Sequence, residues 1–130
     1  MKILILDPER KTSHRISKDT SGGYGTGNDF GDTLVPNILK FLMKRNSDWP
    51  PLHAVYTFSV LEKKGHEVHY HKKLPKDFEK FDLFIVVSSI VCCETEIEFI
   101  EKLSKKNKKI FAIGPFATNI PKKYVDAGAT

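Results

Sequence analysis

The sequence predicts a single α/β domain with a mainly parallel, doubly wound sheet of the flavodoxin-like or Rossmann type. Short apolar runs of strand length alternate along the chain with amphipathic segments of helix length. The run 83–88 is apolar and β-branched almost without a break, which is typical of a strand buried on both faces. Alternating strands and helices pair in parallel through right-handed crossovers, so this fold class follows.

The first strand is expected at 2–6, because Asp7 and Pro8 follow it and proline cannot continue a central ladder. A polar insert with five glycines, 9–32, comes next, and such long inserts are typically functional or disordered. Its Gly25-Thr26-Gly27 stretch lies too far from the strand for a phosphate loop. A flap over a bound cofactor and a plain insertion are the two interpretations.

Two helices are expected after the insert. The first spans 33–44, and its apolar residues fall mainly on one face: Leu34, Ile38, Leu39, Phe41 and Leu42. The second begins at Pro50-Pro51 and ends near Gly65, a candidate C-cap. We expect its buried stripe to be Leu52, Val55, Tyr56, Ser59 and Val60. Trp49 is interpreted as a core plug beneath the connecting loop.

The remaining elements continue the alternation. They are a strand at 67–71, a helical turn at 75–80, a strand at 83–88, a helix at 94–106, a strand at 109–113 and a helix at 121–127 capped by Gly128. The predicted strand order is 2-1-3-4, with strands numbered along the chain. A fifth, outermost strand is expected after Thr130, so we interpret 1–130 as one domain of a longer protein.

Composition and charge narrow the function classes. The 130 residues contain no run near the roughly 18 apolar residues of a membrane span, and the apolar start of the chain is too short for a signal peptide. We therefore expect a cytoplasmic protein. The net charge of +5 comes from lysines at predicted helix ends, densest at 105–109, without interleaved aromatics. We expect solvated helix ends and no nucleic-acid partner, with a docking surface as the alternative.

Small and hydroxyl residues follow three of the predicted strands. Asp7 and Pro8 follow the first, Ser88 and Ser89 the third, and Gly114 the fourth. Ligands of open parallel sheets bind beyond the carboxyl ends of the strands, and glycine allows close backbone approach. The pattern therefore indicates a bound cofactor rather than catalysis by side chains. Ordinary turns, with a helix N-cap near Ser89, are the alternative.

Histidine and cysteine residues offer weaker candidates. His69 and His71 share one face of a short strand, but two ligands make a poor metal site, so a solvated edge is expected. Cys92 and Cys93 lie near a helix N-terminus, which favours thiolate, but they lack zinc spacing and are interpreted as small packing residues. No metal ligand is predicted from these residues.

Five short motifs occur in a fixed order along the chain. They are Asp7-Pro8, Pro51-Leu52-His53-Ala54, Gly65-His66-Glu67-Val68, Ser88-Ser89 and Gly114-Pro115-Phe116-Ala117-Thr118. In this order they resemble the cobalamin-binding domain at the N-terminus of many radical S-adenosylmethionine enzymes. The resemblance implies that cobalamin is held by the following residues: Asp7, Pro8, Ser88, Ser89, Gly114, Pro115, Phe116, Ala117 and Thr118. It also implies a downstream partner domain in the same polypeptide, with the [4Fe–4S] cluster and S-adenosylmethionine.

The chain departs from the family pattern in several places. The Asp-x-His-x-x-Gly motif of the mutases and methionine synthase is absent after the first strand, so cobalamin would bind without that histidine. His14, in the same loop, is an alternative ligand for cobalt. The family's Gly-Gly-Pro is reduced to Gly114-Pro115, and the insert 9–32 has no counterpart. The three-cysteine cluster motif is also absent, so radical chemistry cannot reside in this segment.

Two functions remain open at this point. The first is a cobalamin-binding module that holds the cofactor for a downstream radical enzyme, for example a methyltransferase. The second is a degenerate module that binds no cofactor and serves in docking or substrate recognition. A phosphoacceptor receiver would need a second acid beside Asp7 and an aspartate in place of Ser88. A flavodoxin-type module would need a phosphate loop where 8–10 stand.

Overall fold

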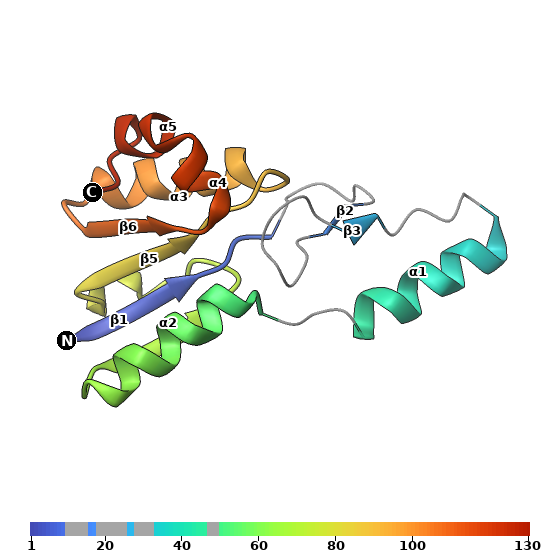
Figure 1. Cartoon of the computed structure of the whole chain (residues 1–130), viewed down its shortest axis with the longest axis horizontal. Helices are drawn as coiled ribbons and strands as arrows, with labels where there is room; N and C mark the ends of the chain where they lie inside the picture. The colour runs from blue at the N-terminus through green and yellow to red at the C-terminus, as the bar shows by residue number, and fades with distance from the viewer. Residues whose placement is uncertain (10–15, 18–25, 28–32, 47–49) are drawn as a thin grey trace.

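The centre of the molecule is a four-stranded, all-parallel sheet (Figure 1). The structure is a computed structural model, and it describes residues 1–9, 16–17, 26–27, 33–46 and 50–130. The strands are β1 (Lys2–Leu6), β4 (Glu67–His71), β5 (Leu83–Val87) and β6 (Lys109–Ile113). Their order, β4-β1-β5-β6, confirms the predicted 2-1-3-4 order and the doubly wound α/β fold.

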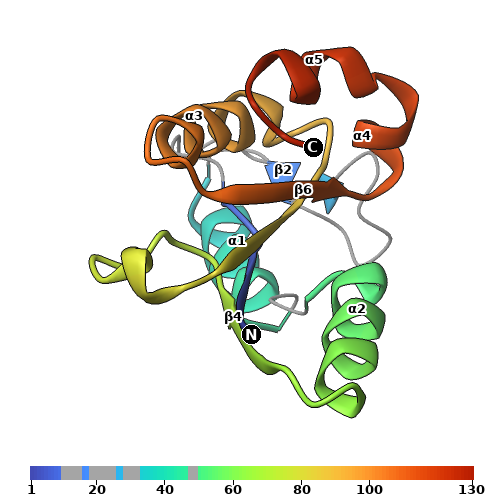
Figure 2. The ribbon, with the colours of Figure 1, turned by 90° about the vertical axis from the view of Figure 1, so that its left-hand side faces the viewer.

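Helices cover both faces of this sheet (Figure 2). The helical elements are α1 (Leu34–Asn46), α2 (Leu52–Lys63), α3 (Cys93–Ser104), α4 (Pro115–Asn119), α5 (Pro121–Asp126) and the 3₁₀ turn η1 (Phe78–Lys80). In the described part of the insert, β2 (Ile16–Ser17) and β3 (Thr26–Gly27) pair in an antiparallel manner. None of the helices among the described residues is long and apolar enough to cross a membrane.

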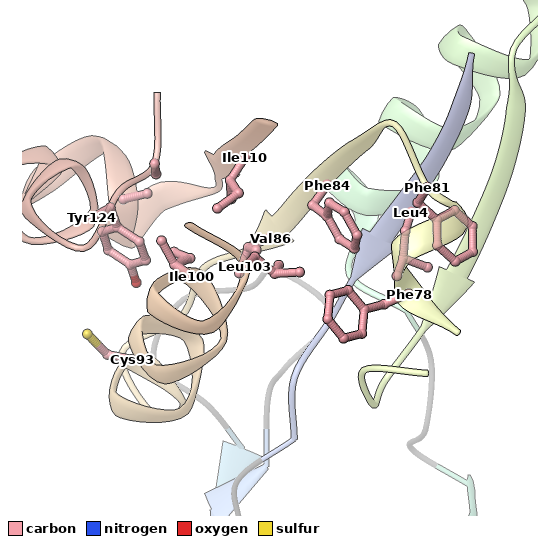
Figure 3. Close-up of a cluster of buried hydrophobic side chains, with 12 residues drawn as sticks. Leu4, Phe78, Phe81, Phe84, Val86, Cys93, Ile100, Leu103, Ile110 and Tyr124 are labelled. Carbon is pink, nitrogen blue, oxygen red and sulfur yellow. The ribbon is translucent and has the colours of Figure 1, made fainter. Parts of the chain in front are cut away.

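The two faces of the sheet carry separate hydrophobic cores, because side chains alternate along each strand. On one face, Ile3 and Ile5 pack with Ala54 of α2. On the other, Leu4 packs with residues of α3, α5 and η1 (Figure 3). All five residues of β5 are buried, which confirms the interpretation of this run as a central strand. Burial of each such side chain is worth roughly 1.5–3 kcal/mol.

The orientation of α2 differs from the predicted one. Leu52, Val55, Tyr56 and Val60 were expected to be buried, but they are exposed, with Tyr56 71% exposed. The packed face is Ala54, which is 1% exposed, together with Phe58 and Leu61. Because α2 carries apolar residues on both sides, helical periodicity could not select one. The small Ala54 side chain allows the helix to approach the sheet closely.

Glycines end two helices in the same way. Gly65 (φ 80°) follows α2, and the N–H of His66 donates to Leu61 O while that of Gly65 donates to Glu62 O. Gly128 (φ 109°) follows α5 with the equivalent pair of bonds to residues 124 and 125. Both ends are Schellman motifs, so both predicted glycine caps are confirmed.

The two capping glycines differ in the space around them. A Cβ atom at Gly128 would lie 2.6 Å from Ser104 Cβ, whereas a Cβ at Gly65 would have no neighbour within 4 Å. Gly65→Ala should therefore cost only the strain of a left-handed alanine, about 1–2 kcal/mol. Gly128→Ala should add overpacking of about 1–3 kcal/mol to the same strain. Urea unfolding of both variants measures the difference, and equal losses would contradict this account.

Candidate functional site

The carboxyl ends of β1, β5 and β6 lie next to one another at one edge of the sheet. In the parallel register, Leu6 pairs with Val86 and Val87 pairs with Ile113, so β5 and β6 end at the same level and β1 ends one residue earlier. The next residues are Asp7, Ser88 and Gly114. The sequence had predicted that these positions converge, and the structure brings them together.

Ser88 and Gly114 lie against each other at this edge. The N–H of Ser88 donates to Ile113 O at 2.7 Å, and Ser88 Oγ accepts from the N–H of Ala117 at 2.9 Å. A Cβ atom at Gly114 would lie 2.8 Å from Ser88 Oγ and 3.0 Å from Ser88 O. Gly114 also has a φ of 114°, which L side chains rarely adopt. Only glycine therefore satisfies both requirements at this position.

His53, in the first turn of α2, lies beside Gly114. Its Nε2 atom would lie 3.1 Å from a Cβ at Gly114. His53 was not predicted as a site residue, because its approach to Gly114 depends on tertiary packing. The imidazole fills the space beside Gly114.

Asp7 is tied to the neighbouring strand β4. Tyr70 Oη donates to Asp7 Oδ2 at 2.6 Å, and the N–H of Asp7 donates to His71 O at 2.9 Å. Burial, followed by the hydrogen bond to Asp7, raises the pKa of the Tyr70 phenol. Asp7 itself is only 4% exposed. Its carboxylate therefore fixes the end of β1 against β4.

A buried carboxylate, that of Glu96, connects the loop after β5 with α5. Glu96 in the first turn of α3 is fully buried, and its Oε1 atom accepts from Ser89 N–H at 2.9 Å and from Ser89 Oγ at 3.0 Å. Tyr124 Oη donates to Glu96 Oε2 at 2.7 Å. Burial, followed by the negative charge of Glu96, raises the pKa of Tyr124. The position near a helix N-terminus also favours a negative charge.

Ser89 accepts a further hydrogen bond, from the N–H of Cys92 at 3.2 Å. Its hydroxyl therefore both donates and accepts within the protein, whereas the N-cap residue of α3 is Cys92. Glu96 was missed in the sequence, because a glutamate in an amphipathic helix is normally interpreted as solvent-exposed.

The predicted site residues divide into a buried floor and an accessible rim. The floor consists of Asp7, Pro8, Ser88, Ser89 and Ala117. In the rim, Gly114 and Phe116 are half-buried, whereas Pro115 and Thr118 are exposed. Asp7 in the floor, like Glu96, is hydrogen-bonded to a tyrosine, an arrangement that suits structure better than proton transfer. The rim offers the backbone at Gly114 and the exposed Pro115 and Thr118, whereas Phe116 packs against the core.

The segment after β6 is helical, which the sequence did not predict. Residues 115–119 form the short helix α4 rather than a simple turn. Pro115 occupies its first turn, where the missing N–H costs nothing, and Thr118 Oγ1 donates to Gly114 O at 3.0 Å. Five residues are too few for a periodic apolar pattern, so the sequence did not show this helix.

Other candidate residues lie away from this edge. His69 Nε2 is 2.8 Å from Glu67 Oε1 on the edge strand β4, and no group of three or more potential metal ligands occurs within the described ranges. Cys92 and Cys93 are both buried, and Cys93 belongs to a hydrophobic core, which confirms its packing role. His14, Trp49 and most of the insert lie outside the described residues.

Comparison with known proteins finds no family model, curated protein or solved structure that matches this chain. The function of the edge is therefore inferred from its own residues and their geometry.

The two tyrosines bonded to carboxylates should make stability depend on alkaline pH. Their folded-state pKa values are raised above the ordinary 10.0, so they contribute stability that is present below pH 10 and lost above it. Replacing both, with Tyr70→Phe and Tyr124→Phe, should flatten this alkaline loss. It should also cost about 1–3 kcal/mol per site at neutral pH, since each substitution leaves a buried acceptor with one donor fewer.

Urea unfolding between pH 7 and about 11 measures both effects, and Tyr56→Phe is the matched control because Tyr56 is exposed. An unchanged alkaline slope in the double variant would contradict the assignment of the two hydrogen bonds.

Proposed function

We propose that this chain is a cobalamin-binding module of a radical S-adenosylmethionine enzyme, for example a methyltransferase. It would hold the cofactor for a catalytic domain of the same polypeptide. The observation that carries this proposal is the convergence of Asp7, Ser88 and Gly114 at the carboxyl edge of a parallel sheet. Ligands of such sheets bind at this edge, next to the point where the strand order reverses.

The rim fits a large, flat cofactor. Gly114 is half-buried and has no side chain, and the exposed Pro115 and Thr118 continue the same surface. A corrin ring could approach this backbone closely. The hydroxyls of Ser88 and Ser89 bond inside the protein, so in this proposal they position the loops and do not touch the cofactor. Gly114, Pro115 and Thr118 are then the contact residues.

Binding of the cofactor's nucleotide arm requires the His53 side chain to move. An arm that enters between α2 and the end of β6 needs the space that His53 fills beside Gly114. The side chain must therefore rotate away when the arm enters. Bound cobalamin would supply the cobalt chemistry, while these residues bind it, orient it and exclude water from one face.

The first test is direct binding. The chain 1–130 is mixed with hydroxocobalamin and passed through gel filtration, and corrin absorbance is expected in the protein peak. Thr118→Arg places a large charged side chain on the rim and should weaken binding about tenfold or more, which corresponds to ~1.4 kcal/mol. Glu101→Arg, on the exposed surface of α3, is the matched control and should leave binding unchanged. Folded protein without a corrin band would refute the proposal.

A second test concerns His53. Removal of the imidazole with His53→Ala opens the space beside Gly114, so hydroxocobalamin should bind more tightly than to the parent protein, by several-fold in a titration. Thr57→Ala, one turn further along α2, serves as the control for changes in the helix. Weaker binding by the His53 variant would show that the imidazole contacts the cofactor rather than obstructing it.

The alternative is a docking or substrate-recognition module that binds no cofactor. The closed floor and the exposed apolar faces of α1 and α2 favour it. Folded protein that binds no cobalamin, yet forms a stable complex with the remainder of its polypeptide, would select this function.

A further inference from the structure

Helix α2 is apolar on two opposite sides. One side, with Ala54, Phe58 and Leu61, packs on the sheet. The other forms a groove of about 440 Å³, which is lined by Leu52, Val55, Tyr56, Ser59, Val60 and Lys63. A helix that is hydrophobic all round is normally buried on all sides. The outer side of α2 therefore has the character of a surface that another element covers.

Helix α1 has a matching, uncovered apolar face. Six large apolar side chains of this helix whose burial is described are 42–77% exposed: Leu34, Val35, Ile38, Leu39, Phe41 and Leu42. The helix stands apart from the sheet and from α2 (Figure 1). Its 13 residues and the 12 residues of α2 give helices of nearly equal length, on the order of 20 Å.

We propose that α1 of one copy packs in the α2 groove of a second copy, so that two chains exchange these helices about a two-fold axis. Helix α2 is preceded by Pro50-Pro51, and Pro51 has the extended backbone φ −59°, ψ 143°. Consecutive prolines are stiff and extended, so these two residues resist folding back onto α2 and favour a partner from another copy.

The available area is sufficient for a stable dimer. Complete cover of the ten exposed apolar side chains on α1 and α2 would remove on the order of 1,000 Å² per chain from water, against roughly 800 Å² per partner in a standard interface. About a two-fold axis the exchange is reciprocal, so each groove and each α1 is used within the pair. The assembly therefore closes at two chains, and neither helix face is left to bind a third copy.

The test is the molar mass of 1–130 in solution, by light scattering after gel filtration over a range of concentrations. The parent protein should be a dimer. Ile38→Glu on α1 and Tyr56→Glu on α2 should each shift it to monomer, while retaining the circular dichroism of the folded domain. Val125→Glu, at an exposed apolar position on α5, is the matched control and should remain a dimer.

Mixing the two monomeric variants separates exchange from packing within one chain. A mixed pair retains one intact helix–groove contact, formed by the unchanged α1 of one chain and the unchanged α2 of the other. Mixing should therefore restore dimers that neither variant forms alone. A monomeric parent protein would overturn the proposal, as would dimers that survive both substitutions or a mixture that stays monomeric. A monomer that co-sediments with anionic lipid vesicles would assign these apolar faces to a membrane surface instead.

Discussion

The hydroxyl groups at the end of β5 need hydrogen-bond partners inside the protein, and this requirement organises the carboxyl edge of the sheet. β5 is buried on both faces, so the chain leaves it with Ser88 and Ser89 still out of contact with water. An unpaired buried hydroxyl is costly. Ser88 therefore binds the amide of Ala117, and Ser89 binds the carboxylate of Glu96. These bonds attach α4, α3 and, through Tyr124, α5 to one strand end.

This network explains why the proposed binding surface is a rim and not a deep slot. The polar groups that the sequence suggests as ligand contacts are already satisfied by the protein, and Gly114 lies too close to Ser88 for any side chain. What remains accessible is the backbone around Gly114, with the exposed Pro115 and Thr118. In the proposed function this backbone orients the cofactor, and His53 fills the space beside Gly114.

The sequence predicted those features that are determined by residues close together along the chain. β1, β4 and β6 were placed at their observed residues, because apolar strand runs bounded by Asp7-Pro8, Gly65 and Gly114 have few alternatives. The glycine caps were also predictable, because glycine is the usual residue after the last turn of a helix. The face of α2 that packs on the sheet was not predictable, since both of its sides are apolar and only tertiary packing selects Ala54. Neither Glu96 nor His53 could be assigned from local pattern, because their roles depend on residues far away in the chain.

Paramagnetic broadening by bound cob(II)alamin, measured on the amide signals of isotope-labelled 1–130, tests the location of the site most directly. The unpaired electron on cobalt broadens nearby signals and leaves distant ones sharp. The signals expected to broaden are those of Gly114, Phe116, Ala117 and Thr118, together with the loop after Ser89. Signals at the opposite edge of the sheet, such as those of Asp82 and Lys109, should stay sharp. Broadening centred on that opposite edge, or on the outer side of α2, would contradict the assignment of the cofactor site to the carboxyl ends of β1, β5 and β6.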